Sequence, residues 1–245
     1  MKNARAGTSV FGIILFMLVS TKRRLRRNMQ RLVFCLACCS YGLSQAGPAS
    51  PSVSFIFDFP GSFPAHYGIN VSADGHASYV SDGKVSKDSD SDQPYSVDFM
   101  VSQTTAKRIF DLAQQADYFQ GHLDSKKKNI ASTGDKTLIY QDANRNSTAS
   151  YNYSSIPAVR ELTTLFQNLS ATLEFGHRLD YDYRYQKLAL DAESKAMEDA
   201  AGRGELLELS AIAPTLHKIV DDPSVINGVR ARLERLLNHA DAAGK

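Results

Sequence analysis

Cysteine is scarce in this sequence, and tryptophan is absent from it. The three cysteines, Cys35, Cys38 and Cys39, lie within five residues of one another near the N-terminus. If that stretch is removed during export, the remaining chain contains no thiol. It could then form no disulfide, and it would have no thiolate to act as a nucleophile or a metal ligand.

Motifs for catalysis and nucleotide binding are missing as well. The chain has no G-x-S-x-G elbow, no P-loop and no glycine fingerprint for a dinucleotide. None of its histidines belongs to an H-E-x-x-H motif, and no two of them have the spacing of ligands on one helix. These histidines are His66, His76, His122, His177, His217 and His239. We therefore predict no catalytic residues, no cofactor and no metal site.

One acidic stretch imitates a calcium loop without completing it. Asp88, Asp90 and Asp92 stand where the first three ligands of an EF-hand loop would be. The sixth position is then Gln93 instead of the required glycine, and the twelfth is Phe99 instead of a bidentate glutamate. We interpret residues 81–93 as a solvated connection.

The basic residues are unevenly distributed along the chain. Residues 1–46 contain eight of the 28 lysines and arginines and no acidic residue. The rest of the chain therefore has 20 basic residues against 26 acidic ones, which is a net charge of −6. The net negative charge of residues 47–245 argues against a nucleic-acid partner, because such a partner would require clustered lysine and arginine.

Residues 29–46 have the three parts of a secretory signal peptide. A basic start is followed by the twelve-residue apolar run LVFCLACCSYGL, and small residues occupy the positions three and one before a cut after Ala46. We predict cleavage there and export to the periplasm or the extracellular space. Two alternatives are a retained membrane anchor, although a span needs about 20 apolar residues, and a lipoprotein acylated at Cys39. The membrane would then be contacted only through this N-terminal segment.

Residues 1–28 allow two interpretations. In the first, translation begins at Met29, and this stretch is not part of the protein. In the second, the apolar run of residues 10–19 inserts into the membrane, and the basic residues 22–27 stay in the cytoplasm by the positive-inside rule.

Alternation of apolar and polar residues predicts a hairpin over residues 67–79. A two-residue turn at Asp74-Gly75 would place Val71 opposite Ser78 and mix polar with apolar side chains on one face. A three-residue loop, Ala73 to Gly75, instead places Val71 opposite Ala77. It also puts Gly75 where a positive φ is needed, so we predict the three-residue loop.

The rest of residues 53–176 repeats this mixture of strand and helix. Strands are predicted at 53–59 and 95–101, and a second hairpin with an even-numbered loop is predicted over 138–153. Helical spacing predicts one helix capped by Ser102 or Thr104 and another that starts at Pro157 and stops at Gly176. We predict an α+β domain at 53–176, after a linker at 47–52, with an antiparallel sheet and two helices packed on one of its faces.

The last part of the chain, residues 177–245, is predicted to be all helical. Alanine, leucine, glutamate and lysine dominate residues 187–201, so we assign the whole stretch 178–201 to one helix. Short helices are predicted around Pro214, and an amphipathic helix covers residues 225–237.

The stretch YGINVSADGHASY at 67–79 resembles an uncharacterised family of bacterial secreted domains. The shared pattern is an alternating strand, a D-G turn and a strand ending in tyrosine, followed by a strand and a helix ending in aromatics, here Tyr118-Phe119. A second hairpin and a helix close the pattern, which covers about residues 53–176. The resemblance implies an exported α+β domain and assigns no catalytic residue.

These observations favour a non-enzymatic binding module over an enzyme. Tyrosine is enriched at interfaces, and five tyrosines suggest docking to an envelope protein or self-association through residues 177–245. They are Tyr151, Tyr153, Tyr181, Tyr183 and Tyr185. The alternatives are ordinary packing between sheet and helices, a hydrolase-like enzyme with a diffuse acid–base site, and a structural or inhibitory envelope protein.

Overall fold

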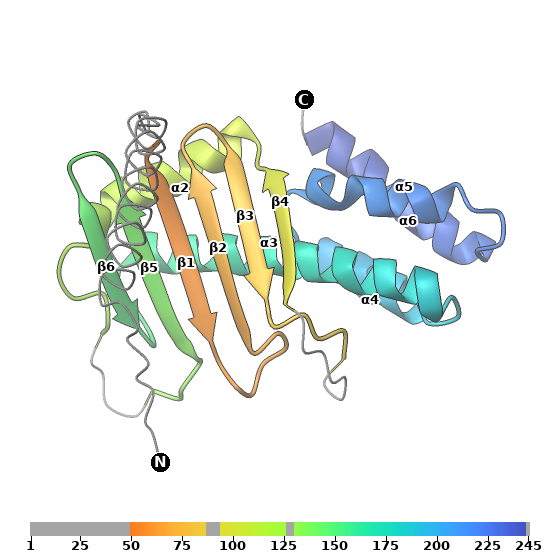
Figure 1. Ribbon diagram of the computed structural model, residues 1–245, viewed down its shortest axis with the longest axis horizontal. Helices are drawn as coiled ribbons and strands as arrows, with labels where there is room; N and C mark the ends of the chain where they lie inside the picture. Colours follow the sequence, from red (N-terminus) through yellow and green to blue (C-terminus); the bar gives the residue numbers. More distant parts are fainter. Residues whose placement is uncertain (1–49, 87–93, 126–129, 244–245) are drawn as a thin grey trace, which may run out of the picture. The chain divides into compact units, whose positions relative to one another are not determined.

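The structure is a computed structural model that describes residues 50–86, 94–125 and 130–243, with side chains to Asn238 (Figure 1). The predicted leader at 1–46 and the acidic positions 88–92 lie outside these ranges. So do residues 47–49 of the linker predicted at 47–52.

A six-stranded antiparallel sheet forms the first part of the described chain. The strands are arranged along the sheet in the order β4-β3-β2-β1-β5-β6, so β1 lies near the middle and β4 and β6 at the edges. Their bounds are Ser52–Asp58 (β1), His66–Ser72 (β2), His76–Ser81 (β3), Tyr95–Met100 (β4), Asp135–Gln141 (β5) and Asn146–Tyr151 (β6). Each strand was expected from its alternating pattern.

Two helices, α2 (Gln103–Gln115) and α3 (Pro157–Tyr185), pack against the buried side chains of the sheet. The ring of Phe55 stacks on Phe166 of α3 with centroids 5.2 Å apart, and Tyr140 meets Phe110 of α2 edge to face. Residues two apart on a strand share a face, and Val53 pairs with Tyr140 across β1 and β5. Phe55 and Tyr140 therefore belong to the same face, and the predicted α+β class is confirmed.

Both hairpins have the predicted geometry. Val71 pairs with Ala77 across a three-residue loop, and Gly75 has a φ of 91° there. In the second hairpin Gln141 pairs with Asn146, which leaves an even loop of four residues, 142–145. Ser102 is the cap of α2, because its side chain accepts a hydrogen bond from the Thr105 N–H.

The prediction that a helix stops at Gly176 is wrong, because α3 continues without a break to Tyr185. Gly176 serves close packing instead of termination. A Cβ atom at this position would lie 2.5 Å from Cγ2 of Ile212, which belongs to the short 3₁₀ helix η2 (Leu209–Ile212). Only a residue without a side chain allows η2 to approach the helix this closely.

The prediction of a single helix over 178–201 is also wrong, because α3 continues past Gly176 into this stretch. Its first eight residues are the end of α3, the chain turns at 186–189, and a separate helix α4 covers Leu190–Gly202. Helix α3 therefore crosses the expected boundary between residues 176 and 177 and belongs to both regions.

Helices α5 (Ala213–Val220) and α6 (Asn227–Ala243) complete the all-helical C-terminal region, which was predicted. Leu216, Ile219, Val229 and Leu233 are fully buried there, so these amphipathic helices cover one another's apolar faces. None of the described helices combines the length and the apolar character that a bilayer-spanning segment needs.

Substituting Gly176 with alanine tests whether the close approach of η2 matters for stability. Alanine has the higher helix propensity, but the clash with Ile212 should dominate and lower the free energy of unfolding by about 1–3 kcal/mol. Urea unfolding followed by circular dichroism measures the change. Gly202→Ala is the matched control, because a Cβ at the end of α4 meets nothing within 4 Å. Equal stability of Gly176→Ala and the wild type would contradict the packing role.

Candidate functional site

A cluster of buried and half-buried polar side chains joins the sheet to α3, and we call it the polar seam: Tyr79, Tyr95, Ser170, Glu174 and His177. Ser170, Glu174 and His177 occur on α3 at intervals of four and three residues, so they lie on one side of the helix. The hydroxyl of Tyr79, on β3, donates a hydrogen bond of 2.7 Å to Glu174 Oε1 and lies 3.0 Å from Ser170 Oγ. These bonds connect a strand to a helix inside the core.

Glu174 and His177 each bury an atom that lacks a hydrogen-bond partner among the described residues. The two atoms, Glu174 Oε2 and His177 Nδ1, face each other at 3.9 Å, which is too far for a hydrogen bond. Glu174 is only 2% exposed. The ring of Tyr95, on β4, stacks on the imidazole with centroids 4.0 Å apart and an interplanar angle of 2°.

The protonation states depend on this environment. Burial raises the pKa of Glu174, but nearby His177 and the hydrogen bond from Tyr79 outweigh burial and hold that pKa below its usual value. Burial, reinforced by the charge of Glu174, raises the pKa of Tyr79 far above its usual range and that of Tyr95 to about 12. Glu174 is therefore ionised at neutral pH, and Tyr79 keeps the proton that it donates.

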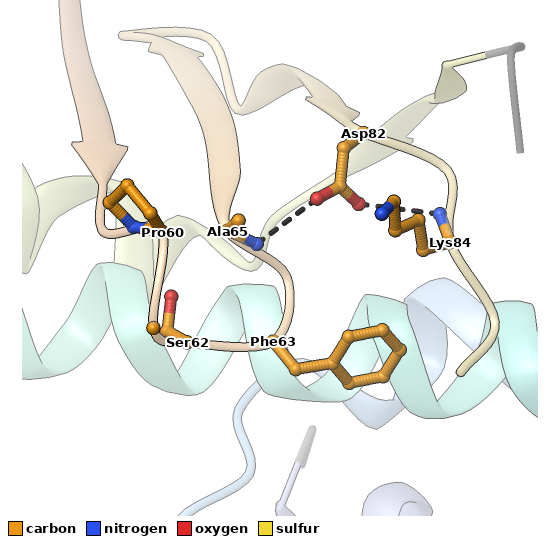
Figure 2. A pocket seen from close by; sticks show the side chains of 7 residues that line it. Pro60, Ser62, Phe63, Ala65, Asp82 and Lys84 are labelled. Atoms are coloured by element: carbon orange, nitrogen blue, oxygen red, sulfur yellow. Dashed lines mark hydrogen bonds between the residues drawn. The ribbon is translucent and has the colours of Figure 1, made fainter. Parts of the chain in front are cut away.

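A pocket of about 180 Å³ lies where β1 leads into β2 and β3 ends (Figure 2). It is lined by Pro60, Gly61, Ser62, Phe63, Ala65, Asp82 and Lys84. The Asp82 carboxylate accepts hydrogen bonds from the backbone N–H groups of Ala65, at 3.1 Å, and Lys84, at 3.3 Å. Asp82 thereby holds the loop together, and neither Glu174 nor His177 lines this pocket.

The described residues contain no group of three or more His, Cys, Asp or Glu side chains placed to hold a metal ion. His66 pairs with Asp58 at the exposed end of β1 and β2. Neither lies in the polar seam.

The five tyrosines from which an interface was predicted do not form one cluster. Tyr151 is buried, and its hydroxyl lies 2.6 Å from that of Thr163, early in α3. The other group, from Tyr181 to Tyr185, forms the last turns of the same helix. Thr163 and Tyr185 are 22 residues apart, which is roughly 33 Å along an α-helix. Of the five tyrosines, only Tyr181, Tyr183 and Tyr185 therefore remain candidates for a shared interface.

Exposed apolar side chains gather at the end of the helical region away from the sheet. We call Tyr185, Leu188 and Ile226 the apolar tip; they are 70%, 92% and 56% exposed. Leu188 lies in the turn between α3 and α4, and Ile226 in the turn between α5 and α6 (Figure 1). Lys187 joins the two turns, because its Nζ donates hydrogen bonds to Asp222 Oδ2 at 2.8 Å and to Ser224 Oγ at 2.7 Å.

Several charged side chains around the apolar tip form ion pairs within the chain. Asp180 forms ion pairs with Arg184 at 2.6 Å and with Lys218 at 3.2 Å, and Lys187 pairs with Asp222. The ammonium groups of Lys187 and Lys218 lie over the ring of Tyr183, 4.9 and 4.8 Å from its centroid. The surroundings of the tip therefore carry both signs of charge.

The sequence analysis singled out neither the polar seam nor Leu188. A signal for the seam was present, because Ser170 and Glu174 come after Phe166 at helical spacing on the apolar side of α3. A polar residue on such a stripe indicates a buried hydrogen bond. Leu188 had no comparable signal, since the assumed continuous helix over 178–201 placed no turn there.

No protein-family model matches this chain, and no curated protein is significantly similar to it.

Substituting Tyr79 with phenylalanine tests the link between β3 and α3. The change removes the donor to a buried carboxylate, so the free energy of unfolding should fall by about 1–3 kcal/mol at neutral pH. The lowered pKa of Glu174 contributes stability above the usual carboxyl range, and this is lost as pH falls through that pKa. The acid-unfolding midpoint of Tyr79→Phe should therefore move to higher pH. Tyr153→Phe, which removes only an exposed hydroxyl contact with Arg160, should change little.

Replacing Asp182 should raise the free energy of unfolding, whereas replacing Tyr79 should lower it. Burial and the charge of Glu193 on α4 raise the pKa of Asp182 to about 6, despite nearby Arg178. The folded chain binds this proton more tightly than the unfolded chain, so the contribution of Asp182 is lost as pH rises through 6. Asp182→Asn should raise the free energy of unfolding by ~1 kcal/mol at about pH 8 and by much less at about pH 4. Asp180→Asn, which breaks two ion pairs, should give no such gain. Lower stability of Asp182→Asn at about pH 8 would contradict this assignment.

Proposed function

We propose that this protein is an exported, non-enzymatic binding module that associates with a second copy of itself through the apolar tip. The observation that carries the proposal is the exposure of Leu188, at 92%, beside Tyr185 and Ile226 on two turns that Lys187 ties together. Single exposed apolar residues are ordinary on protein surfaces, but a group held on adjoining turns favours a contact surface.

The charges around the tip favour a second copy over a partner of one strong charge. Lys187 and Asp222 neutralise each other, as do Asp180 and its two basic neighbours. A surface that carries both signs can meet the same surface on another copy across a two-fold axis without repulsion. Three side chains cover far less than the roughly 800 Å² per partner of stable interfaces, so we propose a weak, reversible contact.

Export is supported by the sequence of residues 29–46 and by the composition of residues 47–245. The chain after Ala46 has a net charge of −6 and no cysteine. Such a chain needs no disulfide to fold, and we propose that it acts in the periplasm or outside the cell. Cell fractionation with the mass and N-terminus of the mature protein tests this part separately, and an intact chain in the cytosol would contradict it.

Self-association should depend on the apolar tip. We expect the weight-average mass of the mature protein in sedimentation velocity to rise with concentration, and Leu188→Ser combined with Ile226→Ser to abolish that rise. The reason is that the apolar area buried between copies supplies the attraction. Val80→Ser is the matched control, because Val80 is an exposed apolar residue on the sheet.

A photo-crosslinking residue at position 188 extends the same test to intact cells. We expect a crosslinked product with twice the mass of the mature protein, and none from a crosslinker at position 80. A product of another mass would replace the second copy with a different protein partner. Recovery of uncrosslinked monomer alone would contradict the binding function.

A further inference from the structure

The outer side of β4 presents backbone groups that no other described residue binds. In the antiparallel ladder between β3 and β4, the Val101 N–H donates to Gly75 O at 3.0 Å. Residue pairs that exchange backbone hydrogen bonds alternate with pairs that do not, so the odd-numbered residues of β4 bond to β3. The N–H and C=O groups of the even-numbered residues, Ser96, Asp98 and Met100, therefore point away from the sheet.

This outer side is continuous along the whole strand. β4 is the last strand of the sheet, and β3 is its only strand neighbour in the described part of the chain (Figure 1). The pairing with β3 runs without a bulge from Tyr95 to Met100, and no proline interrupts the strand. A free edge of this kind is a template for an added strand, because each outward residue offers one donor and one acceptor.

The charge beside this edge is negative. Asp98 is exposed in the middle of β4 and forms no ion pair with another described residue. Just beyond the end of the strand, the Glu208 carboxylate accepts hydrogen bonds from the hydroxyl groups of Ser102, at 2.7 Å, and Thr105. These partners are neutral, and no cation of the described chain pairs with either carboxylate. The edge is therefore complementary to a basic segment.

A second copy of β4 fits this edge poorly. Pairing two copies about a two-fold axis at Asp98 would place two carboxylates opposite each other, and like charges directly opposite are destabilising. The other edge of the sheet lacks this feature, because the outward residues of β6 are Asn146, Thr148 and Ser150. Charge therefore distinguishes the two edges.

The two faces of β4 also differ in the side chains that they offer to an added strand. On the face toward the helices Val97 is half-buried and Phe99 is buried, while Asp98 lies on the opposite face. An added strand alternates in the same way. Its residues beside Val97 and Phe99 would meet apolar side chains, and the residue between them would lie opposite Asp98. The edge therefore fits the pattern apolar, basic, apolar.

We propose that β4 binds an extended basic segment of another protein, which joins the sheet as an additional antiparallel strand. Backbone hydrogen bonds to the three outward residues supply attraction that does not depend on sequence, and a lysine or arginine opposite Asp98 supplies selectivity. This site is separate from the apolar tip. The protein therefore binds a second copy and a basic segment through different parts of its surface.

Amide exchange measured residue by residue by NMR tests the added strand in the mature protein. The probe is the acetylated and amidated peptide Lys-Val-Thr-Val-Lys-Val-Thr, and a control peptide has glutamate in place of both lysines. At saturating probe we expect slower exchange at Ser96, Asp98 and Met100 and little change at Val97 and Phe99, whose N–H groups already bond to β3. The control peptide should bind roughly three- to tenfold more weakly, the range of cross-strand charge pairs.

Variants of both edges provide matched controls. Ser96→Pro removes an outward N–H and should abolish the protection, whereas Thr148→Pro makes the same change on β6 and should preserve it. Asp98→Lys alters only an exposed side chain and should reverse the preference, so that the glutamate peptide binds more tightly. Leu188→Ser combined with Ile226→Ser should bind the probe as the wild type does, which separates this proposal from self-association through the tip.

Three results would overturn the proposal. Unchanged exchange of the outward amides at millimolar probe, or equal slowing of outward and inward amides, would show that no strand is added. Equal affinity of the lysine and glutamate peptides for the wild type would exclude a basic partner. Preference of Asp98→Lys for the lysine peptide would exclude Asp98 as the source of selectivity.

Discussion

Close contact between Gly176 and Ile212 is the constraint on which the arrangement of this chain depends. It lets η2 lie directly against α3, so that one helix contacts both the sheet and the helical region. A side chain at residue 176 would push the two apart, because protein interiors are packed too densely to absorb an extra methyl group freely. The helical region is thus built on the same helix that covers the sheet.

Along α3 the character of the contacts changes from apolar to polar. Near its start and middle the helix meets the sheet through Phe166 stacked on Phe55, while farther on Ser170, Glu174 and His177 meet β3 and β4. Apolar contacts are insensitive to pH, whereas a buried carboxylate beside a histidine depends on where protons lie. The polar contacts of α3 with the sheet therefore lie at β3 and β4, at one edge of the sheet.

The local pattern of apolar and polar residues was enough to predict the strands, the hairpins and the class of fold. Alternation located the strand segments, and the demand that one face stay apolar chose the three-residue loop at Gly75 and the even loop at 142–145. These features depend on residues close in sequence, because register in a hairpin is set by the turn and by which face is buried. The cap at Ser102 was foreseen for the same reason, as one of two possibilities.

Residue patterns were sufficient to predict an antiparallel sheet with amphipathic helices, an all-helical C-terminal region and a body without thiols after residue 46. The position of Gly176 inside a helix could be learned only from the folded chain, because the reason is a contact with Ile212, 36 positions later. The same is true of the burial of Glu174 beside His177 and Tyr95, and of the exposure of Leu188. Glycine ends helices and permits close approach equally well, and a polar residue on an apolar stripe can be solvated or bonded. Which of these holds depends on neighbours that are distant in the sequence.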